Sequence, residues 1–278
     1  MIFRKNKKLV AVTVPLSTRD TLTEDEKISL THLIRHLGPY DKYFLLPKSI
    51  KFEVPGFNNM IFDNHYFGSV DANRKLMFSK EFYKRFKRYE YILIYHLDAL
   101  VFSDQLKEWC QKGYDYIGPP WVRHEKAPYA GLKIENAVGN GGFSLRRIDA
   151  FLKVIDSKRF LLDPQEYWDK AYANENLFVK AINYPKKILK HFSFFNGSKL
   201  EMARFKYNED HFWARRARYY YPDFKTPSVE TALRFGFECL PRHCFELTDR
   251  KLPFGCHAWP KYDRRFWEPY LLKASEDL

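Results

Sequence analysis

The stretch YEYILIYHLDALVFSD (Tyr89–Asp104) contains the most strand-like segment of the chain. Its apolar run is interrupted at His96-Leu97-Asp98 and then resumes. A carboxylate at the end of a buried strand loses hydration energy unless something compensates it. Asp98 is therefore either the cap of the next element or the ligand of a cation or polar molecule. The cap is the weaker explanation, because Ser103 or Asp104 is better placed to cap the helical QLKEWCQKG that follows.

Strand and helix patterns alternate through the first hundred residues. A helix is expected after Thr23, which forms a capping box with Glu26, and Gly38 should end it. Strands are expected at 8–16, 42–47, 59–63 and 91–98, and a second helix at 69–86. This alternation predicts an α/β fold with a mainly parallel central sheet flanked by helices. Ligands of such sheets bind beyond the carboxyl ends of the strands, where Asp98 is expected.

The second half of the chain is less regular. VGNGGFSLRR (138–147) places three glycines around Asn140 just before an expected strand. It lacks the spacing of the phosphate-binding glycine motifs, so we interpret it as a tight turn that lets the backbone approach a ligand. Helices are expected at 148–157 and 208–218, and another should start at Thr226-Pro227. Short strands and loops should follow. The length suits one domain with elaborations.

The formal net charge of +13 favours an anionic partner: nucleic acid, an acidic membrane surface or a phosphorylated small molecule. Nucleic acid is the weakest of these, because no helix-turn-helix, zinc-finger or RNP signature is present and the basic residues are dispersed. The apolar runs are too short to span a bilayer, and the first one contains Pro15 and lacks a signal-peptide cleavage site. We therefore expect a cytoplasmic protein that contacts an anionic membrane peripherally through basic clusters.

The cysteines allow one further alternative. Cys239, Cys244, Cys256 and His257 could form a zinc site, although two adjacent ligands suit tetrahedral geometry poorly. Four cysteines in a chain of this length do not indicate a disulfide scaffold either. Reduced thiols are the better expectation.

Four segments, YHLDALVF, GNGGFSLR, NEDHFW and PFGCHAW, occur in this order. Together they resemble the GT-A class of nucleotide-sugar glycosyltransferases. The closest resemblance is to a bacterial and fungal glycosyltransferase family that carries Tyr-x-Leu-Asp-Ala-Leu-Val-Phe, and it extends from about residue 9 to 267. It implies a single GT-A-like domain over 1–278, with a nucleotide-binding half at about 8–118 and a donor-sugar and acceptor half at about 119–278.

The resemblance also implies a metal site. GT-A enzymes bind the metal through the last carboxylate of an Asp-x-Asp motif. The matching tripeptide in this chain is His96-Leu97-Asp98. Asp98 keeps the metal role, whereas His96 could ligate Mn²⁺ or hydrogen-bond the donor. His257 matches a histidine ligand found late in many of these chains. The implied cofactor is Mn²⁺ or Mg²⁺, held by Asp98 and His257 with the donor phosphates completing the coordination.

Further site residues follow from the same resemblance. Glu209 would contact the acceptor, and Asp210 would be the base that deprotonates its hydroxyl. The implied donor contacts are Thr13, Pro15, His96, Leu97, Asp98, Asn140, Gly141 and Gly142. Two plainer interpretations remain open. The glycine segment could be a hairpin turn without a ligand, and Asn208, Glu209 and Asp210 are also ordinary residues for a first helical turn.

These implications converge on one function. The chain is expected to be a hexosyl- or pentosyltransferase of polysaccharide biosynthesis, which moves a sugar from a nucleotide-diphosphate donor to a glycan or glycolipid hydroxyl with inversion. The replacement of the first Asp by His96 keeps a second possibility open, a catalytically inactive glycan-binding protein with the same fold. A nucleic-acid-binding protein is the third.

Overall fold

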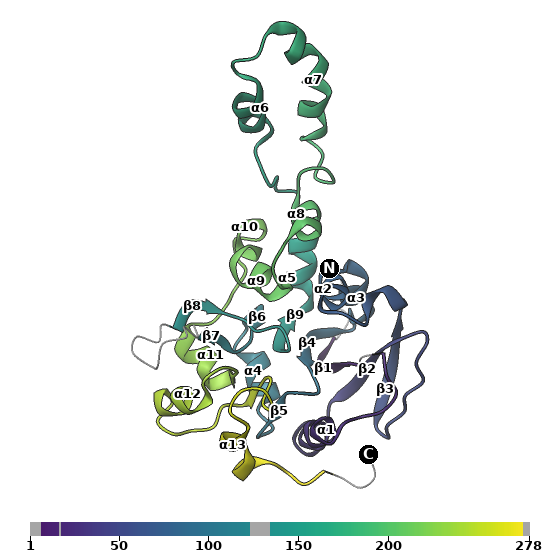
Figure 1. The fold of residues 1–278 in the computed structure, drawn as a ribbon, viewed down its shortest axis with the longest axis vertical. Coiled ribbons are helices and arrows are strands. Elements are labelled where there is room, and N and C mark those ends of the chain that lie inside the picture. Colours follow the sequence, from purple (N-terminus) through teal and green to yellow (C-terminus); the bar gives the residue numbers. More distant parts are fainter. Residues whose placement is uncertain (1–6, 17, 123–133, 275–278) are drawn as a thin grey trace, which may run out of the picture.

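A six-stranded sheet forms the centre of the molecule in a computed structural model that describes residues 7–16, 18–122 and 134–274 (Figure 1). The strand order is β3-β2-β1-β4-β9-β6. β1, β2, β3 and β4 run parallel, whereas β9 is antiparallel to both of its neighbours. The strands are β1 (Lys8–Pro15), β2 (Asp41–Pro47), β3 (Phe57–Phe62), β4 (Tyr89–Tyr95), β6 (Tyr116–Ile117) and β9 (Phe143–Arg147). The predicted α/β class with a mainly parallel sheet is confirmed.

The strand order reverses between β1 and β4. The chain runs from β1 through α1 (Glu24–Leu37) to β2 and β3 on one side of the sheet. It then returns through α2 (Val70–Phe78) and α3 (Lys80–Arg85) to β4 on the other side of β1. The loops that leave β1 and β4 therefore diverge, which opens a crevice at their carboxyl ends. His96, Leu97 and Asp98 directly follow β4 at this point.

Local sequence signals explain most helix boundaries. The predicted capping box of α1 is present: Thr23 accepts the Glu26 N–H at 3.3 Å, and the Glu26 carboxylate accepts the Thr23 N–H at 2.8 Å. The single helix predicted for 69–86 is wrong, because the chain breaks at Ser79 into α2 and α3. The Ser79 hydroxyl accepts the Phe82 N–H at 3.0 Å, so a favoured N-cap residue starts a new helix there.

Other helix predictions need correction. Neither Ser103 nor Asp104 caps α4 (Leu106–Gln111), whose N-cap is Gln105, and the Asp104 carboxylate instead accepts the Tyr40 hydroxyl at 2.9 Å. The expected helices at 148–157 and 208–218 are α5 (Ile148–Ile155) and the pair α9 (Glu209–Arg215) and α10 (Ala217–Tyr220). The helix that was expected to start at Thr226-Pro227 is α11 (Val229–Phe235), and Ser228 caps it.

A small second sheet brings the C-terminal segment to the end of β4. β11 (Gly255–Cys256) lies between β10 (Gly236–Phe237) and β5 (Leu100–Val101). The Trp259 N–H donates to the Asp98 carbonyl at 3.1 Å, which ties the two segments together. The remaining elements are β7 (Pro120–Val122), β8 (Ile134–Val138), η1 (Asn64–Tyr66), α12 (Pro241–Leu247), α13 (Arg264–Trp267) and η2 (Glu268–Tyr270).

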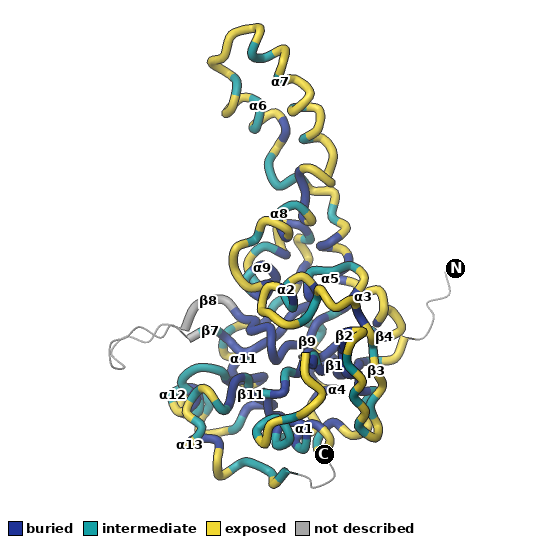
Figure 2. Tube along the Cα trace, turned by 45° about the vertical axis from the view of Figure 1, so that its right-hand side comes forward, coloured by how far each residue is buried: buried dark blue, intermediate teal, exposed yellow. Residues whose placement is uncertain are grey.

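The sequence patterns predicted no element between 158 and 207. The structure places α6 (Pro164–Tyr172), α7 (Leu177–Leu189) and α8 (Ser198–Arg204) there. α6 and α7 form a helical hairpin, called the arm, that projects from the body and is largely exposed (Figures 1 and 2). None of the helices in the described ranges combines the length and the apolar character needed to cross a bilayer.

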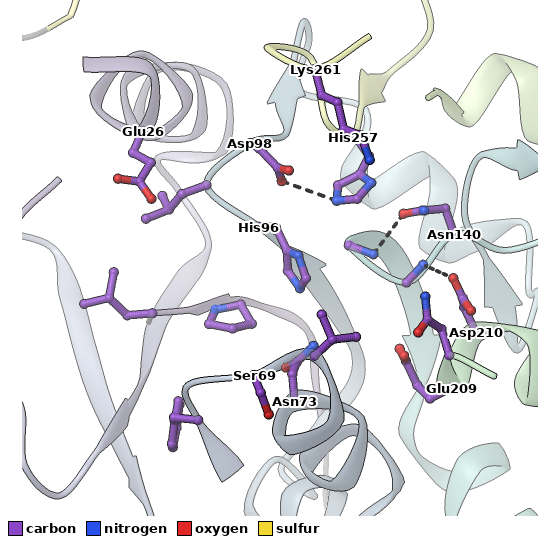
Figure 3. Close-up of a pocket in the computed structure, with 18 of the residues that line it drawn as sticks. Glu26, Ser69, Asn73, His96, Asp98, Asn140, Glu209, Asp210, His257 and Lys261 are labelled. Carbon is purple, nitrogen blue, oxygen red and sulfur yellow. Dashed lines mark hydrogen bonds and ion pairs between the residues drawn. The ribbon is translucent and has the colours of Figure 1, made fainter. Parts of the chain in front are cut away.

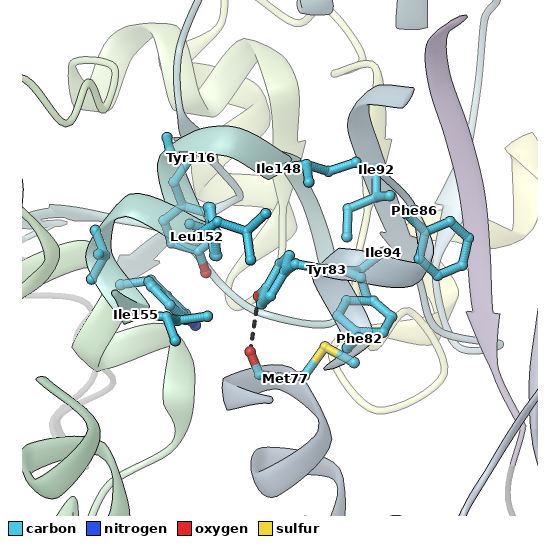
Figure 4. Packing of buried hydrophobic residues seen from close by; sticks show 14 of the residues in the cluster. Met77, Phe82, Tyr83, Phe86, Ile92, Ile94, Tyr116, Ile148, Leu152 and Ile155 are labelled. Carbon is cyan, nitrogen blue, oxygen red and sulfur yellow. Dashed lines mark hydrogen bonds between the residues drawn. The ribbon is translucent and has the colours of Figure 1, made fainter. Parts of the chain in front are cut away.

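Apolar side chains cover both faces of the central sheet. On one face, Tyr83 of α3 and Ile148 of α5 pack against Ile92 and Ile94 of β4 (Figure 4). On the other face, α1 and α4 cover the alternate strand residues, which include Val12 and Leu93. Because successive strand residues point to opposite faces, a strand buried on both sides is mostly apolar, as β1 and β4 are.

Two neighbouring residues of α1 offer a test of this packing. Leu33 is fully buried against the sheet, whereas Ile34 is 37% exposed. Leu33→Ala should lower the free energy of unfolding by about 2–5 kcal/mol, because it leaves a cavity in the core. The matched Ile34→Ala should cost less than about 1 kcal/mol. Urea unfolding would measure both values, and equal losses would contradict this packing.

Candidate functional site

A cavity of about 780 Å³ lies at the carboxyl ends of β1 and β4 (Figure 3). It belongs to the size class of small-molecule and cofactor sites. The structure brings almost all of the predicted site residues together here. The lining includes Pro15, His96, Leu97, Asp98, Asn140, Gly141, Gly142, Glu209, Asp210 and His257.

Thr13 is the exception, because it does not line this cavity. Its side chain is fully buried within β1, and its hydroxyl donates to the Leu93 carbonyl of β4 at 3.1 Å. Thr13 therefore supports the pairing of the two strands that hold the site, and the prediction that it contacts the donor needs correction.

His96, Asp98 and His257 form a cluster whose nearest ligand atoms all lie within 4.8 Å of one another. Asp98 Oδ1 and His257 Nε2 are 3.3 Å apart, yet both are buried atoms without a hydrogen bond in the described part of the structure. The Asp98 side chain as a whole is 45% exposed, through the cavity. The two atoms form an ion pair while His257 is protonated, and a cation that displaces this proton can be shared by both. An imidazole and carboxylate donor set fits Mn²⁺, and it also fits Fe²⁺ or Zn²⁺.

The charges around His257 are strongly coupled. Burial lowers the pKa of His257, but the carboxylates of Asp98 and Glu238 outweigh it and raise this pKa to about 10. Burial likewise opposes ionisation of Asp98, and His257 overcomes it to bring the pKa of Asp98 to about 2. The pKa of His96 falls to about 4, first through burial and then through the His257 charge, so His96 is neutral and can act as a ligand.

Glu238 orients the His257 imidazole of this cluster. It follows β10, and its Oε1 lies 3.0 Å from His257 Nδ1. The same oxygen accepts the Asn140 side-chain amide at 2.7 Å. A carboxylate on the far nitrogen of a ligand histidine sets its orientation and tautomer. Sequence reasoning missed Glu238, although an acidic residue directly after a short apolar strand was a usable signal.

The glycine segment lies in close contact with the side chains of His257 and Glu209. A Cβ at Gly142 would lie 2.0 Å from His257 Nε2, and one at Gly141 would lie 2.6 Å from Glu209 Oε1. Asn140 holds the turn, because its Oδ1 accepts the Gly142 N–H at 2.9 Å. Glycine is therefore required here for the close approach of the protein's own side chains.

Glu209 and Asp210 begin α9 and point toward the glycine segment (Figure 3). The buried Arg146 guanidinium donates to Glu209 Oε1 at 2.8 Å. Asp210 accepts two backbone N–H groups, from Gly141 at 3.3 Å and from His211 at 2.7 Å. Burial, followed by the charge of Glu209, raises the pKa of Asp210 to about 7. A carboxylate with such a pKa can accept a proton near neutral pH.

Arg146 is a second residue that sequence reasoning missed as part of the site. It shares a face of β9 with Ser144, whose hydroxyl accepts the Arg146 Nε–H at 3.0 Å. The available signal was an arginine on the same strand face as the polar Ser144, directly after the glycine segment. Trp259 lies in the core and donates to the Ser29 hydroxyl at 2.9 Å.

The close contact at Gly142 gives a testable consequence. Gly142→Ala should displace the His257 imidazole and weaken Mn²⁺ binding by about tenfold or more, as losses around metal ligands typically do. Isothermal titration with Mn²⁺ would measure the affinity. The double variant Gly142→Ala/His257→Ala removes the clash and should bind Mn²⁺ no more weakly than His257→Ala alone. Unchanged Mn²⁺ affinity in Gly142→Ala would show that His257 does not take part.

Comparison with known proteins gives distant structural relatives and a family for the chain. The chain resembles, at a distance, the crystal structure of a glycosyltransferase involved in the glycosylation of the major capsid of PBCV-1 (11% identity, TM-score 0.41, covering 94% of this chain and 98% of that chain). It also resembles the glycosyltransferase GlyE of Streptococcus pneumoniae TIGR4 in its apo form (14% identity, TM-score 0.38) and in a second structure (TM-score 0.39). The alignment covers 95% of this chain and 60% of each GlyE chain. A search of curated proteins finds no match. Residues 56–257, well over half of the chain, match the family described as "Protein of unknown function (DUF5672)", and the chain therefore belongs to the DUF5672 family.

Proposed function

We propose that this protein is a metal-dependent glycosyltransferase of the GT-A type. It would move a hexose or pentose from a nucleotide-diphosphate sugar to a hydroxyl of a glycan or glycolipid, as in polysaccharide biosynthesis. One observation carries the proposal: a single cavity at the reversal of the strand order contains both a three-residue cation cluster and a separate buried carboxylate, Asp210. Sugar transfer from such a donor needs one group that neutralises the leaving diphosphate and another that accepts the hydroxyl proton.

The cation cluster is the proposed donor side of the site. Asp98, His257 and His96 would hold Mn²⁺ or Mg²⁺, and their two imidazoles favour Mn²⁺. The bound ion would supply positive charge for the donor diphosphate. Arg19 and Lys261 line the same cavity and add cationic side chains to that side. Pro15, Leu97 and the segment from Asn140 to Gly142 would form the walls against which the donor lies.

The carboxylate pair is the proposed acceptor side. Asp210 would take the proton of the acceptor hydroxyl while that oxygen attacks the sugar, which corresponds to an inverting mechanism. Glu209 is fixed through Oε1 by Arg146, so its other oxygen remains to orient the acceptor. In this proposal, residues at about 8–118 bind mainly the nucleotide, and those at about 119–278 shape the donor-sugar and acceptor sites.

Removal of the metal tests the donor side. Hydrolysis of a panel of nucleotide-diphosphate sugars with Mn²⁺, measured as release of the nucleoside diphosphate, should identify the donor. EDTA should abolish this hydrolysis. Asp98→Ala should lower it on the order of 10²-fold or more and weaken donor binding, because the diphosphate charge is no longer neutralised.

The controls separate three outcomes. His257→Ala should lose less activity than Asp98→Ala and recover part of it in excess Mn²⁺, because His96 and Asp98 remain. Full activity in EDTA together with an inactive Asp98→Ala would mean that Asp98 binds the donor directly. Donor binding with no turnover in the presence of any acceptor would instead support a glycan-binding protein.

The pKa of Asp210 predicts the pH dependence. Asp210 can act as a base only when it is ionised, so kcat/KM should rise with pH and level off above its pKa of about 7. Asp210→Asn keeps the shape of the side chain but loses the proton acceptor, which should cost about 10²- to 10⁴-fold in kcat above pH 7 and less below it, where the wild-type carboxyl is already protonated. Donor binding should be preserved. A pH profile of the wild type that stays flat through neutrality would exclude Asp210 as the base.

A further inference from the structure

The helix α7 of the arm exposes large apolar side chains to solvent. Leu177, Phe178 and Ile182 are 85%, 72% and 61% exposed. Tyr184, Ile188 and Leu189 continue the same face of the helix, because Ile188 follows Tyr184 by four residues, and Tyr184 and Leu189 follow Leu177 and Ile182 by seven. None of the residues of α7 is buried. Exposed apolar side chains scattered singly are normal in proteins, but a continuous stripe of them is not.

The opposite face of α7 is polar, and this face packs against α6. Lys187 donates to Gln165 at 2.6 Å, and Asn183 accepts the Tyr172 hydroxyl at 3.3 Å. Lys180 donates to the Ala173 carbonyl at 2.8 Å. A surface helix normally buries its apolar face and exposes its polar one. α7 does the reverse. Within the described part of the chain, Tyr184 at the edge of the stripe contacts Trp168 of α6, with ring centroids 5.8 Å apart, and the other stripe residues are left exposed to solvent.

The apolar surface continues beyond the end of α7. Phe192, Phe194 and Phe195 are 55%, 72% and 45% exposed in the segment that returns to the body. We call this surface, from Leu177 to Phe195, the arm stripe. It lies on the hairpin that projects from the body (Figure 2), so a large flat partner could reach it without meeting the rest of the molecule.

The charged residues within the segment of the arm stripe are all lysines. Between Asn176 and Gly197 the chain has four lysines, Lys180, Lys186, Lys187 and Lys190, and no acidic residue. Helical geometry puts Lys180 and Lys186 on the two flanks of the stripe. Acidic residues lie outside this segment: Asp163, Glu166, Asp169 and Glu175 precede it, and Glu201 follows it. The surface is therefore apolar in the centre and cationic at the edges.

We propose that the arm stripe binds an anionic lipid bilayer. Large apolar residues on one face of a helix, bordered by lysines, are typical of helices that lie in the interface of a membrane. The lysine stems can lie along the apolar surface while their ammonium groups reach the lipid phosphates. A second copy of this chain fits less well, because a symmetric contact through α7 would place lysines against lysines. The proposal stands independently of the glycosyltransferase function.

Vesicle co-sedimentation of the full chain tests the proposal. Vesicles of phosphatidylcholine with about 30% phosphatidylserine should bind the wild type at least about tenfold more strongly than phosphatidylcholine alone, and salt should weaken the binding. Phe178→Gln/Ile182→Gln/Leu189→Gln should reduce binding by tenfold or more. These side chains are exposed, so the melting temperature should be unchanged. Lys186→Gln/Lys190→Gln should reduce only the part that depends on phosphatidylserine.

Matched variants on the body provide the controls. Ile34→Gln/Leu247→Gln replaces exposed apolar residues outside the arm, and Lys84→Gln/Lys87→Gln removes charge from another basic cluster. Both should bind vesicles like the wild type. Equal binding by the triple arm variant and the wild type, or no binding by the wild type, would overturn the proposal. A wild-type dimer that the triple variant dissociates, in the absence of vesicle binding, would overturn it in favour of a contact between two copies.

Discussion

The parallel pairing of β1 with β4 is the interaction on which the site depends. The two strands are in register from Lys8 opposite Tyr89 to Thr13 opposite Ile94, and the Thr13 hydroxyl adds a side-chain bond between them. Because the chain reaches β2 on one side of β1 and β4 on the other, the loops after β1 and β4 separate and leave a cavity. The glycine turn that completes the cavity is attached through β9, which pairs with β4. The residues after β10 and β11 belong to the small second sheet, whose strand β5 follows β4 in the chain.

The cavity concentrates buried charge, and each charge is compensated differently. Asp98 and Glu238 share the His257 imidazole, whereas Glu209 has the Arg146 guanidinium. Asp210 accepts two backbone N–H groups, and burial followed by the neighbouring charge of Glu209 outweighs them and raises its pKa to about 7. The separation of a strongly ionised carboxylate from a weakly ionised one in the same cavity is typical of sites that combine charge stabilisation with proton transfer.

The helices of the arm and of the body pack through different faces. In the body, helices bury their apolar faces against the sheet, as α1 does through Leu30 and Leu33. In the arm, α7 uses its polar face for the contact with α6, so the usual hydrophobic stabilisation of a helix pair is small there. The apolar stripe then becomes a property of the surface, available to a partner outside the chain. Catalysis and attachment would thus be assigned to separate parts of one molecule.

The sequence by itself determined the strands, the class of the sheet and the position of Asp98, because hydrophobic periodicity and caps are local signals. The capping box of Thr23 and the apolar runs of β1 and β4 are examples. The prediction from the sequence was wrong at Ser79, where one helix ends and a second helix begins at once. It was also wrong for Thr13, a polar residue inside a strand whose hydroxyl has a structural partner. Only the tertiary structure decided that Glu238 meets His257, that Arg146 holds Glu209, and that α7 exposes its apolar face. These relations join residues far apart in the chain, and the packing of the whole fold sets their distances.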